Sequence, residues 1–137
     1  EAGVVVVAAA GNNGKTAAGQ KIYGAIHSPG NDPTVITVGA ANTFGTDARN
    51  DDTVTTFSSR GPTRSYWTDA GGVKHFDHLI KPDLVAPGNL IIGADSKGNR
   101  IANENEDLEV ANHADDSRKM MYLSGTSFCG CRQRIRS

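Results

Sequence analysis

The sequence predicts an α/β fold, in the form of a partial, largely parallel β-sheet with few helices. Two observations carry this prediction. Residues 4–10 form an apolar run without interruption that is rich in β-branched residues, which is typical of a strand covered on both faces of a parallel sheet. Helix signals are poor along the chain, although parallel strands need helical connections and covering layers. The sequence therefore predicts an incomplete domain, part of whose fold lies outside this chain.

Further strand candidates share a short apolar composition and a turn signal at one end. They are residues 34–41, 53–57, 83–86, 90–94 and 120–123. Asn31-Asp32-Pro33 introduces the first of them, and Pro87-Gly88 stops the strand expected over residues 83–86. The last candidate leads directly into a Ser-Gly-Thr-Ser sequence.

Two segments lack strand signals. Residues 58–81 are polar and contain Gly-Pro and Gly-Gly pairs, so they are predicted to form a loop. Residues 95–119 are polar and rich in acidic side chains, and are predicted to form a long excursion or flap.

The composition excludes several classes of partner. With 137 residues, of which 37% are hydrophobic and 6% aromatic, the chain holds at most one domain with a modest aliphatic core. The net charge of -1 gives no reason to expect nucleic acid or an anionic membrane as a partner, and no apolar run approaches the length of a membrane span. Cys129 and Cys131 are too close in sequence for an ordinary disulfide. No cofactor is predicted.

Ser127 is the candidate nucleophile. It follows a short apolar strand and the flexible turn Ser124-Gly125-Thr126. Such a turn displays a serine at the end of a strand, where the chain enters a helix. Taken alone, the same pattern also describes an ordinary surface loop.

Asn12 is the candidate oxyanion donor. It follows the apolar run and Gly11, so its carboxamide is well placed at the tip of a strand to donate a hydrogen bond to a developing oxyanion. Taken alone, an Asn beside glycine is more often a plain turn residue.

Five motifs follow one another along the chain. They are Ala8-Ala9-Ala10-Gly11-Asn12, Thr34-Val35-Ile36-Thr37-Val38-Gly39-Ala40, Phe57-Ser58-Ser59-Arg60-Gly61-Pro62, Lys81-Pro82-Asp83-Leu84-Val85-Ala86-Pro87-Gly88 and Ser124-Gly125-Thr126-Ser127. In this order they strongly resemble the C-terminal half of the catalytic domain of the subtilisin-like serine protease family, the subtilases. The resemblance predicts a partial subtilisin-like peptidase domain over residues 1–128 and an atypical Arg-rich tail over residues 129–137.

The resemblance implies roles for the matched residues. Ser127 matches the nucleophile that forms the acyl-enzyme, and Asn12 matches the side-chain donor of the oxyanion hole, with the backbone N–H of Ser127 as second donor. One wall of the pocket for the side chain before the scissile bond is expected from small residues at and just after the end of the first strand. The turn before the nucleophile is expected to contact substrate. These substrate-binding residues are Ala9, Ala10, Gly11, Gly125 and Thr126.

Two parts of the family pattern have no counterpart in this sequence. Family members place the catalytic Asp and His before the segment that matches Glu1. The histidines of this chain all lie outside matching motifs: His27, His75, His78 and His113. After Phe128 the family continues with a buried apolar helix, whereas residues 129–137 contain three arginines. A change of reading frame or a cloning junction would produce so abrupt a loss of pattern.

Three functions follow as hypotheses. The first is a subtilisin-like endopeptidase acting on peptides, extracellular by family resemblance, whose Asp and His are absent from this chain. The second is a carboxylesterase acting on short or activated esters, which have better leaving groups than amides. The third is an inactive half-domain that associates with itself through exposed sheet edges. No metal site is predicted, because the acidic residues 103–107 lack the ligand spacing and glycine of a calcium loop.

Overall fold

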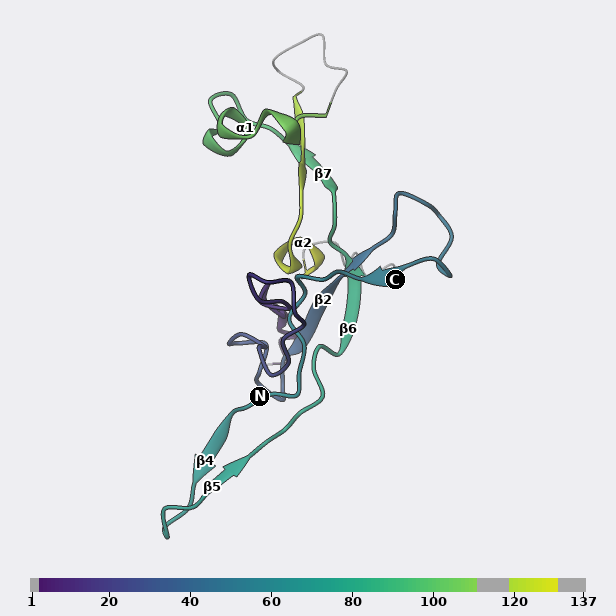
Figure 1. The fold of residues 1–137 in the computed structure, drawn as a ribbon. Coiled ribbons are helices and arrows are strands. Elements are labelled where there is room, and N and C mark those ends of the chain that lie inside the picture. Colours follow the sequence, from purple (N-terminus) through teal and green to yellow (C-terminus); the bar gives the residue numbers. More distant parts are fainter. Residues whose placement is uncertain (1–2, 111–118, 131–137) are drawn as a thin grey trace.

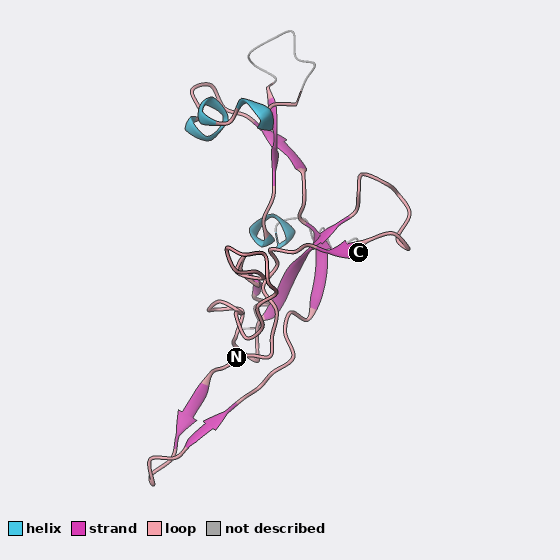
Figure 2. Ribbon diagram, viewed as in Figure 1, coloured by secondary structure: helices cyan, strands magenta, loops and turns pink. Residues whose placement is uncertain are grey.

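A four-stranded sheet forms the centre of the molecule in the computed structural model, which describes residues 3–110 and 119–130 (Figures 1 and 2). β2 (Ile36–Asn42) pairs in parallel with both β1 (Val7–Ala9) and β6 (Leu84–Pro87), and antiparallel with the short β3 (Thr53–Val54). The predicted α/β class, with a partly parallel sheet and few helices, is confirmed.

The core lies on one face of β2. Val38 and Ala40 point to the same face because side chains alternate along a strand, and both are fully buried against Cys129 of α2 (Thr126–Gly130). Gly88 leaves room for that packing, since a Cβ there would lie 2.4 Å from the Cys129 sulfur. The helix that carries the candidate nucleophile is therefore held directly on the central sheet.

Two hairpins project in opposite directions from this sheet (Figure 1). One consists of β4 (Tyr66–Thr68) and β5 (Lys74–Phe76), the other of β7 (Ile91–Ala94) and β8 (Met120–Leu123). The solvent-accessible surface is 9735 Å² for a chain of 14.4 kDa, against roughly 6800 Å² for a compact monomer of that mass. The chain therefore buries less of its surface than a compact domain of its size.

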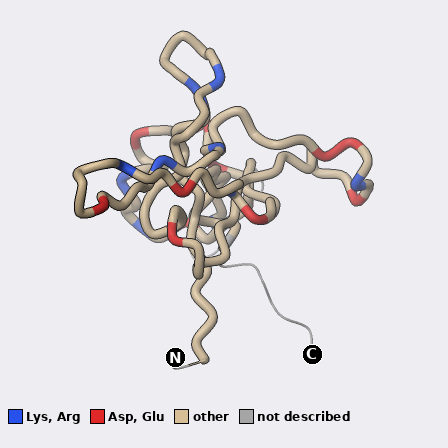
Figure 3. Tube along the Cα trace, turned by 90° about the horizontal axis from the view of Figure 1, so that it is seen from below, with Lys and Arg blue, Asp and Glu red and all other residues tan. Residues whose placement is uncertain are grey.

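Short helical segments lie at the far end of the second hairpin: α1 (Arg100–Glu104) and the 3-10 helix η1 (Glu106–Leu108). They occupy part of the predicted excursion. Among the described residues, no helix has the length and apolar character needed to cross a membrane. Acidic and basic positions occur on the same projecting loops, as Figure 3 shows.

The structure corrects two sequence expectations. The loop predicted over residues 58–81 contains the β4–β5 hairpin, because the Asp69–Gly72 turn reverses the chain and pairs Tyr66 with Phe76. The first strand is shorter than predicted, and Val4 and Val5 are 75% and 70% exposed rather than covered. In the described part of the chain β1 pairs with β2 alone, so one of its edges has no strand beside it.

The remaining strand predictions hold with shifted ends. The strand over residues 120–123 is confirmed, those over 34–41, 83–86 and 90–94 are displaced by one or two residues at their ends, and that over 53–57 shrinks to β3. Cys129 and Gly130, the start of the predicted tail, belong to α2, and residues 131–137 lie outside the described part.

Candidate functional site

Two segments that are 114 residues apart in sequence meet at the carboxyl end of β1. Residues 11–14, named here the oxyanion loop, follow β1, and α2 begins shortly after β8 (Figure 1). The Gly11 N–H donates to Thr126 Oγ1 at 3.1 Å. The loop and the start of the helix are thus joined directly.

The Asn12 carboxamide is fixed by Thr126. Asn12 Oδ1 accepts hydrogen bonds from the Thr126 backbone N–H and from Thr126 Oγ1, both at 3.0 Å. A backbone N–H can only donate, so the Asn12 atom that faces it must be the oxygen. Asn12 Nδ2 is therefore directed away from Thr126, and it lies 3.5 Å from the place that a Cβ on Gly125 would occupy. The amide donor sits beside the turn that precedes Ser127.

Ser127 is the second residue of α2 and is exposed to solvent. The turn in front of it is tied down, because Ser124 Oγ accepts from the Leu90 N–H at 2.9 Å and donates to Asn89 Oδ1 at 3.3 Å. The expected strand–turn–helix geometry around the serine is present. It presents Ser127 on the surface, directly after Thr126, the residue that binds Asn12.

The expected substrate-binding residues differ in what they offer to a ligand. Ala10 is fully buried, whereas Ala9 and Gly11 keep accessible surface. Thr126 is only 1% exposed, and its hydroxyl group is engaged with Asn12 and Gly11. The structure therefore gives Thr126 the task of holding Asn12. A pocket-wall role stays a proposal for Ala9 and Gly11.

His27 lies against the oxyanion loop. A Cβ on Gly11 would lie 2.8 Å from His27 Cγ, and Gly11 has a φ of +101°, so both space and backbone conformation require glycine there. His27 Nε2 lies 2.8 Å from Asn13 Nδ2, which donates to it. His75 and His78 lie in and beside β5, and His113 is outside the described residues.

Sequence reasoning missed Ser59 as a residue of this site. Its Oγ accepts the backbone N–H of Asn13 at 3.0 Å, and its side chain is fully buried. The available signal was a pair of small hydroxyl residues, Ser58 and Ser59, inside a motif to which no role had been assigned.

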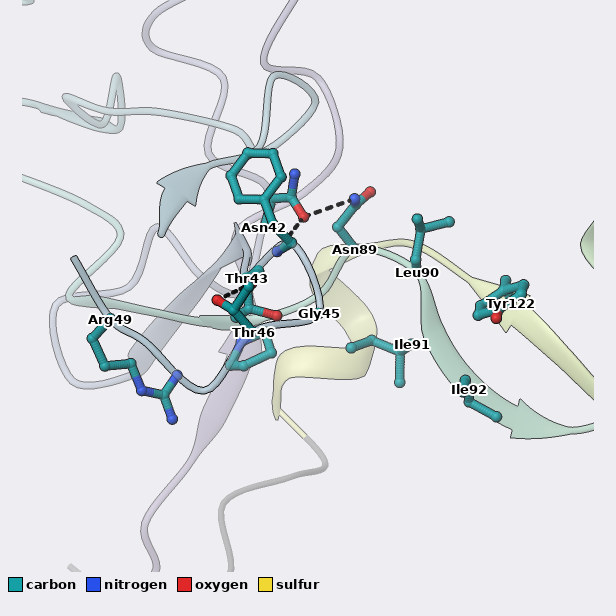
Figure 4. Close-up of a pocket in the computed structure, with 12 residues that line it drawn as sticks. Asn42, Thr43, Gly45, Thr46, Arg49, Asn89, Leu90, Ile91, Ile92 and Tyr122 are labelled. Carbon is teal, nitrogen blue, oxygen red and sulfur yellow. Dashed lines mark hydrogen bonds between the residues drawn. The ribbon is translucent and has the colours of Figure 1, made fainter. Parts of the chain in front are cut away.

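A cavity of about 670 Å³ lies apart from the candidate nucleophile, between the loop after β2 and the start of β7 (Figure 4). The Asn89 side chain donates to Asn42 Oδ1 across it at 3.1 Å, and Tyr122 of β8 lines it as well. Neither Asn12 nor Ser127 is among the lining residues. The cavity is therefore separate from the site formed by the oxyanion loop and the start of α2.

The Cys129 thiol is a second candidate nucleophile, close to Ser127 in sequence. Burial raises the pKa of the Cys129 thiol above its ordinary value, and its sulfur points at the carbonyl oxygen of Ala86 at 3.3 Å. A buried thiol with a raised pKa stays protonated at neutral pH. Cys129 therefore serves packing and does not compete with the serine.

Comparison with known proteins gives the family. The family model for peptidase S8, the subtilase family, matches residues 1–130. Over 126 residues the chain is 37% identical to serine protease AprX of Bacillus subtilis (strain 168), a match that covers 92% of this chain and 23% of AprX. The chain thus spans about a quarter of the length of that relative.

Solved structures agree with this result. The prenylagaramide maturation protease PagA is 26% identical, with a TM-score of 0.50 over 93% of this chain and 28% of that one. The S41 psychrophilic protease is 23% identical, with a TM-score of 0.51 over 93% of this chain and 30% of that chain. This match supports the fold. Because the family model covers nearly the whole sequence, this chain belongs to the subtilase family.

Proposed function

We propose that this chain carries the nucleophile and the oxyanion-stabilising groups of a subtilisin-like serine endopeptidase. One observation carries the proposal: Asn12 Oδ1 accepts two hydrogen bonds from Thr126, the residue before Ser127. This arrangement fixes the Asn12 amide donor beside the turn that precedes the serine. Subtilase membership indicates a peptide as the substrate class. We also propose that the protein is secreted from the cell.

In the proposed reaction, Ser127 Oγ attacks the scissile carbonyl carbon and loses its proton to a general base. The carbonyl oxygen becomes an oxyanion, which accepts hydrogen bonds from Asn12 Nδ2 and the Ser127 backbone N–H. The proton then passes to the leaving amine, and water releases the acyl group by the same steps. The base and its aspartate match no motif of this chain, so we propose that a segment outside these residues supplies them.

A chimaera tests the proposal. Residues 1–128 would replace the aligned segment of AprX, which contributes the remainder of a serine protease. We expect the chimaera to cleave casein and to react with a fluorophosphonate probe. Ser127→Ala should abolish both, while Ser96→Ala, a change at an exposed serine after β7, should keep both. A folded chimaera that reacts equally well after Ser127→Ala would contradict the assignment of the nucleophile.

Asn12→Ala separates the oxyanion role from the nucleophile. Removal of this donor from subtilisin, a member of this family, lowers kcat about 10²–10³-fold, and a loss of that order is expected here with KM little changed. Unchanged kcat in a folded Asn12→Ala chimaera would overturn the oxyanion assignment.

Ester hydrolysis by the 137-residue chain alone is a second candidate function. Both proposed oxyanion donors come from this chain, and oxyanion stabilisation with binding gives residual catalysis in enzymes whose triad is broken. We expect slow release of p-nitrophenol from p-nitrophenyl acetate, reduced by Ser127→Ala and Asn12→Ala. Equal rates for the chain and both variants would remove this candidate.

Self-association is a third candidate, as expected of an inactive half-domain. The exposed valines before β1 and the strand's open edge favour it. Size-exclusion chromatography tests it: Val5→Lys should shift the chain from a larger species toward the monomer. A monomeric wild-type chain would exclude this candidate.

A further inference from the structure

The oxyanion loop has no regular secondary structure, apart from a single bridge beyond its end, yet it carries a side chain whose position must be precise. Donors for an oxyanion act at 2.7–3.1 Å, and functional side chains need to be held within about 0.5 Å. Thr126 fixes the Asn12 carboxamide, but it does not fix the backbone on both sides of Asn12. Another part of the molecule has to do that.

Ser59 contacts the backbone on both sides of Asn12. The Ser59 N–H donates to the Gly11 carbonyl oxygen at 2.8 Å, and Ser59 Oγ accepts the Asn13 N–H at 3.0 Å. One buried residue therefore holds the peptide groups that come immediately before and after the oxyanion donor.

The neighbours of Ser59 tie down the end of the same loop. The Gly14 N–H donates to the Phe57 carbonyl oxygen at 2.8 Å, and Arg60 Nη1 donates to the Gly14 carbonyl oxygen at 3.2 Å. Arg60 also binds the carbonyl oxygens of Ser58 at 3.2 Å and Thr55 at 3.1 Å. Residues 57–60 thus form a cradle whose own backbone is held by the Arg60 guanidinium group.

Packing makes the fit close. Ser59 is fully buried, and a Cβ on Gly11 would lie 3.0 Å from Ser59 Oγ. The hydroxyl oxygen therefore lies directly against the backbone that leads into Asn12. A displacement of this oxygen would be transmitted to the loop, because the buried site leaves no free space to absorb it.

We propose that Ser59 is a positioning residue of the oxyanion site, which holds the Asn12 backbone through its N–H and hydroxyl groups and acts on catalysis only through Asn12. The inference rests on the proposed function, since it gives Ser59 a task in the reaction assigned to Asn12 and Ser127. Its physical basis, a hydroxyl acceptor for the Asn13 N–H, is independent of that reaction and can be measured separately.

Ser58 provides a matched control. It is adjacent to Ser59, is equally buried, and its Oγ accepts a backbone N–H at 3.1 Å, that of Ala40 in β2. Ser58→Ala and Ser59→Ala therefore remove the same kind of buried hydrogen bond. Only Ser59→Ala removes one that holds the oxyanion loop.

The kinetic test compares these variants in the AprX chimaera. Ser59→Ala should lower kcat about tenfold with KM unchanged, because a displaced catalytic group costs one to two orders of magnitude. Ser58→Ala should change kcat less than about twofold. In the Asn12→Ala background, Ser59→Ala should have almost no further effect on kcat, since residues that act as a unit are not additive.

The outcomes separate the two proposals. If Asn12→Ala leaves kcat unchanged, the proposed function fails. The positioning role is overturned if Asn12→Ala lowers kcat but Ser59→Ala does not. It is also overturned if Ser59→Ala lowers kcat no more than Ser58→Ala does, or if its effect on kcat is as large in the Asn12→Ala background as in the unaltered chimaera. Amide hydrogen exchange in the 137-residue chain gives a readout without activity: Ser59→Ala should speed exchange at Asn13 at least tenfold and Ser58→Ala should not. Unchanged Asn13 exchange in Ser59→Ala would also overturn the inference.

Discussion

The oxyanion loop and the β4–β5 hairpin are both short, Gly-containing segments, but they are held in opposite ways. The loop is fixed by residues far away in sequence: Ser59 lies 46 residues from Asn13, and Thr126 lies 114 from Asn12. The hairpin is fixed by its own turn. Asp69 accepts the N–H groups of Gly71 and Val73 at 2.9 Å, and it pairs with His75 at 2.8 Å.

This difference separates a segment that depends on the whole fold from one that does not. The contacts of the oxyanion loop exist only when the central sheet and α2 have assembled around the loop. A change in the loop is therefore expected to affect the stability of the central sheet. Hairpin contacts span a few residues, and its strands are exposed on all sides. An isolated two-stranded hairpin is marginally stable in water, so we expect the hairpin to open without unfolding the sheet. The experiments below test this comparison and the sheet on which the loop depends.

The largest effect is expected from glycine replacements, one in each segment. In Gly14→Ala the new Cβ would lie 2.2 Å from the Ser58 carbonyl oxygen, a backbone atom that cannot move aside. We expect a loss of about 3 kcal/mol or more in the free energy of unfolding. Gly72 has a φ of +82° and nothing within 4 Å, so Gly72→Ala should cost only the backbone strain, about 1 kcal/mol. Urea denaturation followed by far-UV circular dichroism measures both. Similar losses for the two variants would contradict the comparison.

A smaller effect is expected from the Lys81–Asp83 ion pair, named here the brace, which links β2 to the segment that leads into β6. Buried Lys81 donates through Nζ to the Val35 carbonyl oxygen and to Asp83 Oδ2, each at 2.7 Å, and Asp83 Oδ2 also accepts the Thr37 N–H at 2.7 Å. Lys81→Met keeps the length but removes these bonds and leaves Asp83 without its cation. We expect a loss of about 2 kcal/mol, at the low end for charged partners because Asp83 is partly exposed.

The same brace gives a pH dependence. The hydrogen bond from Lys81, followed by that from the Thr37 N–H, lowers the pKa of Asp83 below its ordinary value of 3.8. A carboxylate with a lowered pKa stabilises the fold above its unfolded pKa, and this contribution is lost as the pH falls through the folded pKa. The free energy of unfolding should therefore decline below about pH 4. In Asp83→Asn this decline should be shallower, and an unchanged slope would count against the brace.

The smallest effect is expected in the hairpin. Trp67, the single tryptophan of the chain, stacks on His75 with ring centroids 4.3 Å apart. Asp69→Ala removes the acceptor that closes the turn and the partner of His75. Because Trp67 is already 63% exposed, its fluorescence should change mainly through loss of the stacked His75 ring. The overall free energy of unfolding should change by less than about 0.5 kcal/mol.

The hairpin variant also serves as a check on the site. Since the hairpin projects away from the oxyanion loop (Figure 1), kcat of the AprX chimaera should stay within about twofold after Asp69→Ala. A loss of stability above about 1 kcal/mol, or a loss of kcat, would show that the hairpin is coupled to the central sheet.

The sequence by itself determined the elements whose signal is local. The central strand β2 was predictable because its β-branched residues favour a buried strand. The valine run before β1 shows the limit of this signal, since Val4 and Val5 lie outside the strand and are exposed. The strand–turn–helix around Ser127 was predictable for a similar reason, since Ser124-Gly125-Thr126 permits a tight turn. The hairpin at residues 66–76 was missed, because its polar residues resemble a loop until Tyr66, Trp67, His75 and Phe76 pair across it.

Only the tertiary structure decided how the site is put together. The motifs indicated Asn12 and Ser127 as candidates, but the orientation of the Asn12 carboxamide depends on Thr126, and the path of its backbone depends on Ser59. Hydrogen bonds between residues 46 and 114 positions apart leave no periodic pattern in a sequence. These hydrogen bonds form only after β1 has paired with β2 and α2 has packed on the sheet, because this arrangement brings the donors and acceptors within bonding distance.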